Sequence, residues 1–253
     1  MFEVIRIPAF KDNYIWLLRK GASAVVVDPG DARPVIEVLE REGLTLSSIL
    51  VTHHHNDHQG GVAGLQARYR AEVFAPATES ITAVTRPLLG GETISLLSLG
   101  VKFQVLAVPG HTSGHIAYFG AGCLFCGDTI FGAGCGRLFE GTPAQMHDSL
   151  TRLAALPEQT MVYCAHEYTE ANLRFALTVE PGNRRLRQRV DEVAVARAKG
   201  LATVPFPLAI EKATNPFLRC TEPEVVASAQ NRATQADDAL AVFTALRMWK
   251  NDF

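Results

Sequence analysis

Short apolar runs separated by turn-forming residues dominate the first part of the chain. Each run is only a few residues long, and turn-forming segments such as Lys11-Asp12-Asn13 and Lys20-Gly21 separate the first runs, which is the pattern of buried strands. Two longer segments carry apolar side chains at helical spacing, and Pro34 suits the first turn of one of them. Predicted strands cover residues 2–7, 14–19, 24–28, 48–51 and 72–75, and predicted helices cover residues 33–42 and 62–69.

A second block repeats this alternation. Its predicted strands cover residues 93–97, 101–108, 116–119, 123–126 and 161–164, and its predicted helix covers residues 143–156. Strands in both blocks with helices between them predict two sheets packed face to face and covered outside by helices. We therefore expect an α+β fold, a four-layer αββα sandwich.

The pattern changes after about residue 170, where helical spacing and Pro breaks replace the strands. Residues 233–250 predict a final amphipathic helix, with Leu240, Phe243 and Leu246 along one stripe. We expect two domains: residues 1–168 form the main domain, and residues 169–253 form a smaller α-helical domain.

Composition excludes several classes of protein. The chain has 253 residues with 24 Lys+Arg against 26 Asp+Glu, so it lacks the basic surface typical of nucleic-acid binding. No run approaches the roughly 18 apolar residues of a membrane span, and the N-terminal residues lack a signal-peptide pattern. Five scattered Cys do not indicate a disulfide framework, so we expect a cytoplasmic protein.

The segment Thr52-His53-His54-His55-Asn56-Asp57-His58 directly follows an apolar strand. In an extended backbone His53, His55 and Asp57 face the same way, and His58 faces a second point nearby. A solvated, His-rich loop is the alternative. Clustered imidazoles and a carboxylate without a metal would waste hydrogen bonds, so the segment favours a metal site.

Three later strands also end in residues that ligate metals. They lead into His111, Asp128 and His166. Together with His53, His55, Asp57 and His58 of the His-rich loop, these residues make seven candidate ligands. Seven are too many for one catalytic zinc, which typically takes three protein ligands. Seven are enough for two ions if one carboxylate bridges them, and two ions activate water at neutral pH.

These motifs resemble the metallo-β-lactamase fold superfamily and, within it, the hydroxyacylglutathione hydrolase (glyoxalase II) family. The Thr-His-x-His-x-Asp-His motif is similar to that of the superfamily as a whole. The specific family is indicated by two further segments, Gly134-Cys135-Gly136-Arg137 and Asn215-Pro216-Phe217-Leu218-Arg219, and by the helical tail. The resemblance covers nearly the whole chain.

The resemblance implies a shell for each of two ions. His53, His55 and His111 would hold the first ion, Asp57, His58 and His166 would hold the second, and Asp128 would bridge both. The ions would be zinc, with iron or manganese as alternatives. A bridging hydroxide, with Asp57 as the catalytic residue beside it, would attack the thioester S-D-lactoylglutathione and yield glutathione and D-lactate, in the second step of methylglyoxal detoxification.

The resemblance also implies a glutathione site that involves the helical domain. Arg137 and Tyr168 match residues that contact glutathione, while Arg247 and Lys250, three apart on the last helix, match a pair that binds its glycine carboxylate. Phe139 stands where the family often has tyrosine, so one hydrogen bond to substrate would be missing. The expected partner is this small molecule alone, with no nucleic acid or membrane, and the chain is expected to be a monomer.

Two rival activities remain at this point. A persulfide dioxygenase of the same superfamily would use a single iron and typically fewer of these ligands. A hydrolase of a β-lactam, lactone or phosphodiester would not need the basic residues near the C-terminus. Retention of all seven ligands together with Arg247 and Lys250 favours the thioester hydrolase.

Overall fold

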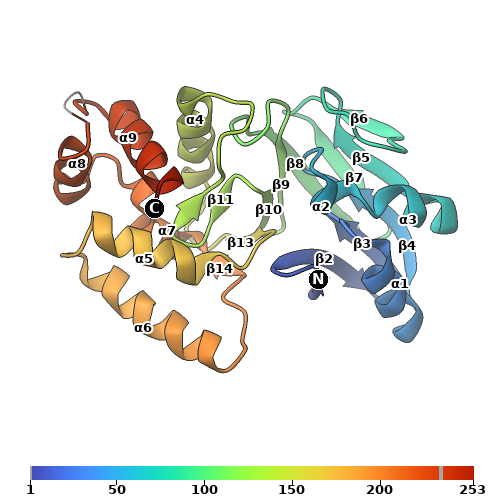
Figure 1. The fold of residues 1–253 in the computed structure, drawn as a ribbon. Coiled ribbons are helices and arrows are strands. Elements are labelled where there is room, and N and C mark those ends of the chain that lie inside the picture. The colour runs from blue at the N-terminus through green and yellow to red at the C-terminus, as the bar shows by residue number, and fades with distance from the viewer. Residues whose placement is uncertain (1, 234–235) are drawn as a thin grey trace. The chain divides into compact units, whose positions relative to one another are not determined.

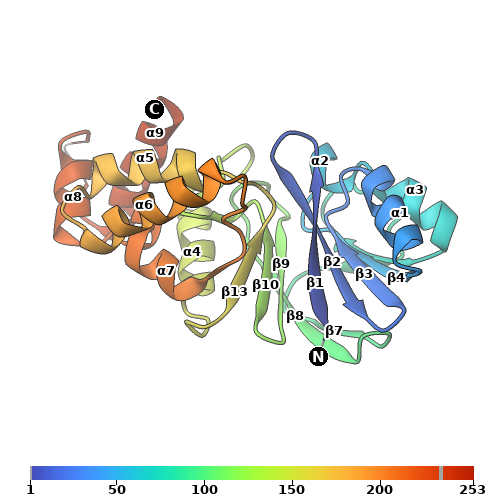
Figure 2. The same cartoon turned by 90° about the horizontal axis from the view of Figure 1, so that it is seen from below.

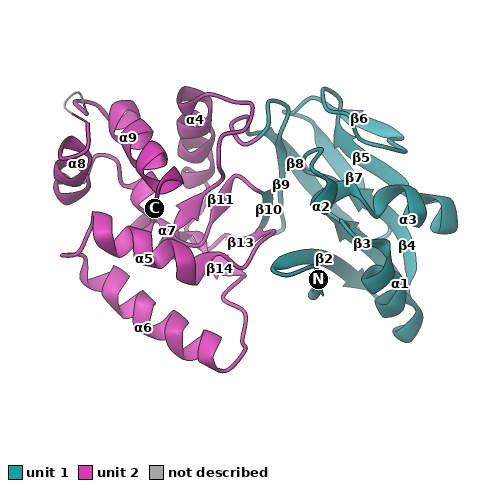
Figure 3. Cartoon of the chain, viewed as in Figure 1, with its two compact units in different colours: residues 1–108, 112–127 teal, residues 109–111, 128–253 magenta. Residues whose placement is uncertain are grey.

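The computed structural model describes residues 2–233 and 236–253, which divide into two compact units. Unit 1 comprises residues 1–108 and 112–127, and unit 2 comprises residues 109–111 and 128–253 (Figure 3). The predicted domain boundary after residue 168 is a different division of the chain and stays a prediction.

Unit 1 contains two groups of strands. The first sheet has the order β1-β2-β3-β4-β5-β6 and consists of Glu3–Ala9 (β1), Asn13–Lys20 (β2), Ser23–Val27 (β3), Thr45–Leu50 (β4), Glu72–Pro76 (β5) and Arg86–Leu88 (β6). The second group is antiparallel in the order β10-β9-β8-β7 and consists of Thr93–Leu96 (β7), Val101–Ala107 (β8), Ile116–Gly120 (β9) and Cys123–Gly127 (β10). Its helices are Ala32–Arg41 (α1), Asn56–Gln59 (α2) and Val62–Tyr69 (α3).

Helices α1 and α3 lie on one face of the first sheet, and strands β7 to β9 lie on its other face (Figure 2). Val35 and Leu39 of α1 and Leu65 of α3 are buried with the inward side chains of β1 to β5 in one apolar cluster. Because these apolar side chains are buried on one face of each helix, their helical spacing in the sequence predicted both helices. The predicted helix–sheet–sheet layering of this part is confirmed.

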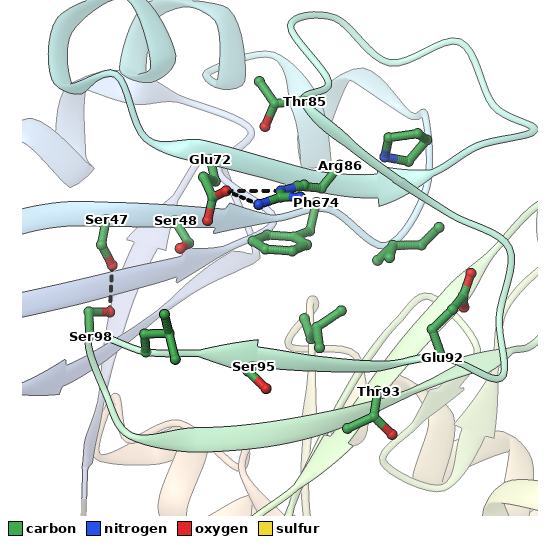
Figure 4. Close-up of a pocket in the computed structure, with 14 residues that line it drawn as sticks. Ser47, Ser48, Glu72, Phe74, Thr85, Arg86, Glu92, Thr93, Ser95 and Ser98 are labelled. Atoms are coloured by element: carbon green, nitrogen blue, oxygen red, sulfur yellow. Dashed lines mark hydrogen bonds and ion pairs between the residues drawn. The ribbon is translucent and has the colours of Figure 1, made fainter.

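A cavity of about 700 Å³ lies between the two sheets of unit 1 (Figure 4). Phe74 lines it, the Glu72–Arg86 ion pair of 2.8 Å stands at its side, and Ser47 and Ser98 close one end with a 2.7 Å hydrogen bond between their hydroxyls. None of the predicted metal ligands lines this cavity. It is therefore not the candidate site, although it is large enough for a small molecule.

Unit 2 is mostly helical (Figure 1). It comprises Ile130–Phe131 (β11), Gly134–Cys135 (β12), Pro143–Ala154 (α4), Met161–Cys164 (β13), Thr169–Val179 (α5), Arg184–Ala198 (α6), Phe206–Pro207 (β14), Leu208–Thr214 (α7), Pro216–Leu218 (η1), Pro223–Gln230 (α8) and Ala239–Asn251 (α9). β11 pairs with β12 and β13 pairs with β14, both antiparallel. Leu173 and Ala176 of α5 pack with Leu186 and Val193 of α6 in a second apolar cluster.

Most predicted elements agree with the structure to within a few residues, and α3 and β13 have the predicted bounds. The final helix begins later than predicted, because Asp238 caps it by accepting a hydrogen bond from the Ala241 amide at 2.8 Å. Residues 234–235 of the predicted range lie outside the described residues. Within the described residues, no helix combines the length and apolar character needed to cross a bilayer.

Candidate functional site

The His-rich loop of unit 1 follows β4, as predicted, and gathers its side chains into two pairs. His53 Nε2 lies 3.1 Å from His55 Nδ1, and His58 Nε2 lies 3.5 Å from Asp57 Oδ2. Two atoms that share a tetrahedral zinc at about 2.0–2.1 Å are roughly 3.3 Å apart. Both pairs therefore have the spacing of metal ligands.

Asp28 fixes this loop through contacts of its carboxylate. Its carboxylate accepts hydrogen bonds from the amide and the hydroxyl of Thr52, both at 2.8 Å, and its Oδ2 lies 3.1 Å from His58 Nδ1. The Thr52 hydroxyl donates to Asp28, so it accepts from His53 Nδ1 at 3.1 Å. A neutral imidazole that donates from Nδ1 has its free lone pair on Nε2. The rings of His53 and His58 can therefore both bind a metal through Nε2.

Two further residues of unit 1 support the loop. The buried Asn13 donates from Nδ2 to Asp57 Oδ2 at 2.9 Å, and the buried His115 stacks on the His53 ring with centroids 4.6 Å apart. Asn13 is the first residue of β2 and was not predicted as a site residue. The sequence around it indicates only a turn between two strands, so it does not reveal where the amide points.

Unit 2 brings the other three predicted ligands together around one carboxylate. Asp128 Oδ2 lies 3.4 Å from His111 Nε2 and 3.4 Å from His166 Nε2. All three residues are buried. One carboxylate oxygen of Asp128 therefore lies at ligand spacing from both imidazoles.

Backbone groups of unit 2 fix His111. Its Nδ1 donates to the Arg137 carbonyl at 2.7 Å, so its Nε2 carries the lone pair. The chain approaches closely here, since a Cβ on Gly136 would lie 2.0 Å from the Asp128 carbonyl oxygen and 3.2 Å from His111 Nδ1. A side chain at position 136 would displace both predicted ligands.

Aromatic rings flank the unit 2 ligands. Tyr168 stacks on His166 with centroids 4.6 Å apart and planes 7° apart, and Phe131 meets His166 edge-on. The exposed Phe139 ring meets His111 edge-on at 5.3 Å. Phe139 therefore lies beside a predicted ligand.

The predicted cationic residues lie within unit 2, but their surroundings differ. Arg247 is only 5% exposed, and its guanidinium donates to the Cys135 carbonyl at 2.9 Å and to Asn251 Oδ1 at 3.2 Å. Arg137 is exposed, with Nε 3.4 Å from the same Asn251 oxygen. Asn251 thus joins two of the predicted substrate-binding cations and was missed by the sequence analysis.

Lys250 is the cation most altered by its surroundings. Burial, the charge of Arg247 on the same helix and that of Arg174 on α5 lower its pKa from 10.5 to about 8, although Cys135 on β12 opposes this shift. Its Nζ lies 5.1 Å from the centre of the Phe175 ring. A partly desolvated ammonium of this kind gains more from a carboxylate partner than an exposed one.

Known proteins match the chain along its full length. The family described as Metallo-beta-lactamase superfamily matches residues 10–166, and the family described as Hydroxyacylglutathione hydrolase C-terminus matches residues 167–253. Hydroxyacylglutathione hydrolases from Dechloromonas aromatica and Photobacterium profundum are 59% and 52% identical, and in each case both chains are covered in full.

Solved structures share the fold at lower identity. The crystal structure of ETHE1 from Myxococcus xanthus is 27% identical with a TM-score of 0.59, and covers 87% of this chain and 99% of its own. TTHA1623 in a di-iron-bound form is 26% identical with a TM-score of 0.60, and covers 85% of this chain and 100% of its own. The predicted α+β metallo-β-lactamase fold is confirmed, and the family and the clustered His and Asp side chains indicate a divalent metal site.

Proposed function

Because the chain belongs to the hydroxyacylglutathione hydrolase family of the metallo-β-lactamase superfamily, we propose that it hydrolyses S-D-lactoylglutathione and related S-2-hydroxyacylglutathiones to glutathione and the free acid. The observation that carries this proposal is full-length identity of 52–59% to relatives that bear this name. This identity, together with the family match to residues 167–253, favours the thioester hydrolase over the persulfide dioxygenase. D-lactate production would complete the second step of methylglyoxal detoxification.

Two divalent ions, most simply zinc, are proposed for the site. His53, His55 and His111 would hold one ion, Asp57, His58 and His166 would hold the other, and Asp128 would be shared. The ligand-like spacing within each unit and the di-iron form of TTHA1623 support this arrangement. A shell of imidazoles and carboxylates also accepts iron or manganese.

Bound ions of this kind would lower the pKa of a water molecule and polarise the substrate carbonyl. In the proposed mechanism Asp57 orients the attacking water and accepts its proton, with its own orientation fixed by Asn13. The leaving thiolate has a solution pKa near 8.5, so it departs without a dedicated general acid.

Substrate recognition is assigned to residues of unit 2. Arg137 and Tyr168 would contact the glutathione peptide, and Arg247 and Lys250 would bind its glycine carboxylate. The lowered pKa of Lys250 and the short link from Arg247 through Asn251 to Arg137 support a cationic cluster adapted to one anionic ligand. We propose residues 1–168 as the catalytic domain and residues 169–253 as the substrate-binding domain, in agreement with the meeting point of the two family matches.

A cytoplasmic monomer is proposed as the working form. All five cysteines are free and buried, which suits a reducing compartment.

The direct test is thioester hydrolysis followed by the loss of thioester absorbance. We expect turnover of S-D-lactoylglutathione by metal-replete protein, loss of activity after chelation, and recovery when zinc is restored. Oxygen uptake with glutathione persulfide serves as the comparison. Metal-replete protein that consumes oxygen with the persulfide and leaves the thioester intact would overturn the proposal.

A second expectation concerns Asn13. Replacing it in Asn13→Ala removes the hydrogen bond that orients Asp57, and outer-shell partners of this type typically contribute 10–100-fold to activity. We expect kcat to fall about tenfold with KM unchanged, since Asn13 is not assigned to substrate. Steady-state kinetics beside the exposed control Asn231→Ala will measure the effect. A change in KM alone would contradict the assigned role.

A further inference from the structure

A single carboxylate, that of Glu79, joins two loops that carry predicted metal ligands. Glu79 lies after β5 and is half-buried. Its Oε2 accepts a hydrogen bond from the His54 amide at 2.6 Å, between His53 and His55. Its Oε1 accepts from the Gly114 amide at 3.0 Å and from the Thr112 hydroxyl, directly after His111.

The contact is tight on the side of the second loop. A Cβ on Gly114 would lie 2.3 Å from Thr78 Oγ1 and 2.6 Å from Glu79 Cγ. Only a residue without a side chain therefore lets the 112–115 loop close on Glu79. The carboxylate of Glu79, which accepts hydrogen bonds on both oxygens, and Gly114 therefore pack closely against each other.

Gln59 reinforces the same connection from the other side. Its amide nitrogen donates to the His54 carbonyl at 2.6 Å and to the Ser80 carbonyl at 3.0 Å, and its amide oxygen accepts from the Thr82 amide at 3.1 Å. The segment after β5 is therefore fixed to both sides of His54 by hydrogen bonds. The position of the His53–His55 pair depends on these bonds, because the loop has no regular secondary structure between β4 and α2.

We propose that Glu79 is a positioning residue that holds the His53–His55 loop against the 112–115 loop of unit 1, and thereby sets the affinity of the ion that His53 and His55 are proposed to hold. The proposal rests on the proposed function only in the assignment of that ion. Glu79 accepts three hydrogen bonds from the two loops, two from backbone amides and one from the Thr112 hydroxyl, and through them it fixes the two loops to each other. Nothing in the sequence pattern around Glu79 indicated this role.

The test is Glu79→Gln in the full chain, with zinc as the probe. The amide keeps the size of the carboxylate but offers one acceptor oxygen in place of two, so one loop loses its partner. We expect zinc affinity at one of the two sites to fall by 10–100-fold, in the range typical of outer-shell partners. After dialysis the variant should retain about one zinc per chain where the native protein retains two.

Glu92→Gln is the matched control. Glu92 also accepts two backbone hydrogen bonds, from Leu89 at 2.6 Å and Gly90 at 2.7 Å, in the same unit but away from the His-rich loop. Thr112→Val is a second variant, which removes one hydroxyl donor to Glu79 and preserves the shape of the side chain. It should weaken zinc at the same site, less than Glu79→Gln does.

Competition with a chromophoric chelator gives both zinc constants, and the thermal midpoint reports on folding. Selective loss at one site with an unchanged midpoint supports the proposal. Two zinc ions held with native affinity in Glu79→Gln, or the same affinity change in Glu92→Gln, would overturn it. Native protein that binds no zinc would instead refute the proposed function, so the two failures are distinguishable.

Discussion

Asp128→Asn is expected to lower kcat/KM for S-D-lactoylglutathione by about a thousandfold, which corresponds to about 4 kcal/mol of lost transition-state stabilisation. Asp128 Oδ2 lies at ligand spacing from both His111 and His166, so one substitution removes a negative charge from both proposed shells. The amide keeps the side-chain shape but coordinates hard cations weakly and cannot bridge them as an anion. We therefore expect the metal content to fall together with activity.

Metal analysis and kinetics on the same preparation will check this expectation. Asp148→Asn is the matched control, because Asp148 is exposed and pairs with Arg152 at 3.1 Å on the surface of α4. The control should retain native metal content and rate. An Asp128→Asn protein that holds two ions per chain and turns over within tenfold of native would show that Asp128 is not shared.

The candidate metal ligands could be proposed from the sequence because their positions follow a rule of chain order. His53, His111, Asp128 and His166 each follow an apolar strand within a few residues, and strand ends place side chains at a sheet edge. The residues that orient them follow no such rule. Asp28 has a positive φ of 51° within a short turn, and Asn13 and Glu79 are single polar residues whose contacts lie 44 and at least 25 positions away in sequence. Only the folded backbone reveals these contacts.

The fold was predictable to a similar extent. Short apolar runs located most of the longer strands, whereas β6 was missed because Arg86-Pro87 is typical of a strand break, and Pro is tolerated at an edge such as this one. The four-residue helix α2 was missed because it consists of polar and ligand residues with no apolar period. Both omissions occur where the sequence departs from the average pattern of a buried element.

Arg247 illustrates a role that periodicity could not supply. Near the end of a helix a basic residue is ordinarily solvated, yet this guanidinium is buried against β12 and lies 5.2 Å from the centre of the Phe217 ring. The Arg247 guanidinium is buried here because the Asn215-Pro216-Phe217 segment supplies a buried aromatic ring beside it. The predicted cationic pair therefore consists of one fixed guanidinium and one desolvated ammonium.

The fixed position of Arg247 predicts the second large effect on kcat/KM. Arg247→Ala should lower kcat/KM about a hundredfold, near 3 kcal/mol, and should change both kcat and KM. The Cys135 carbonyl loses its donor, and the β11–β12 hairpin that links Asp128 to Arg137 loses an anchor. Arg247→Lys should not restore activity, because an ammonium cannot reproduce the planar, forked donor of arginine. Recovery in the lysine variant would contradict this geometry.

Lys250→Ala should instead raise KM about tenfold and leave kcat unchanged, since Lys250 donates no hydrogen bond to the hairpin and is assigned to the substrate carboxylate alone. Lys199→Ala, an exposed lysine at the end of α6, is the control. Native KM in Lys250→Ala would remove Lys250 from the proposed glutathione site.

The pH dependence of KM provides an independent check on the same residue. The pKa of Lys250 lies at about 8 in the folded protein, so the ammonium is present below that pH and is lost as the pH rises through it. The loss of this charge weakens carboxylate binding, and KM for the thioester should rise between pH 8 and pH 9.5 in the native protein. The charges of Arg247 and Arg174 both act on Lys250 and lower its pKa. The rise should be absent in Lys250→Ala, and its persistence there would assign the titration to the substrate or to another group.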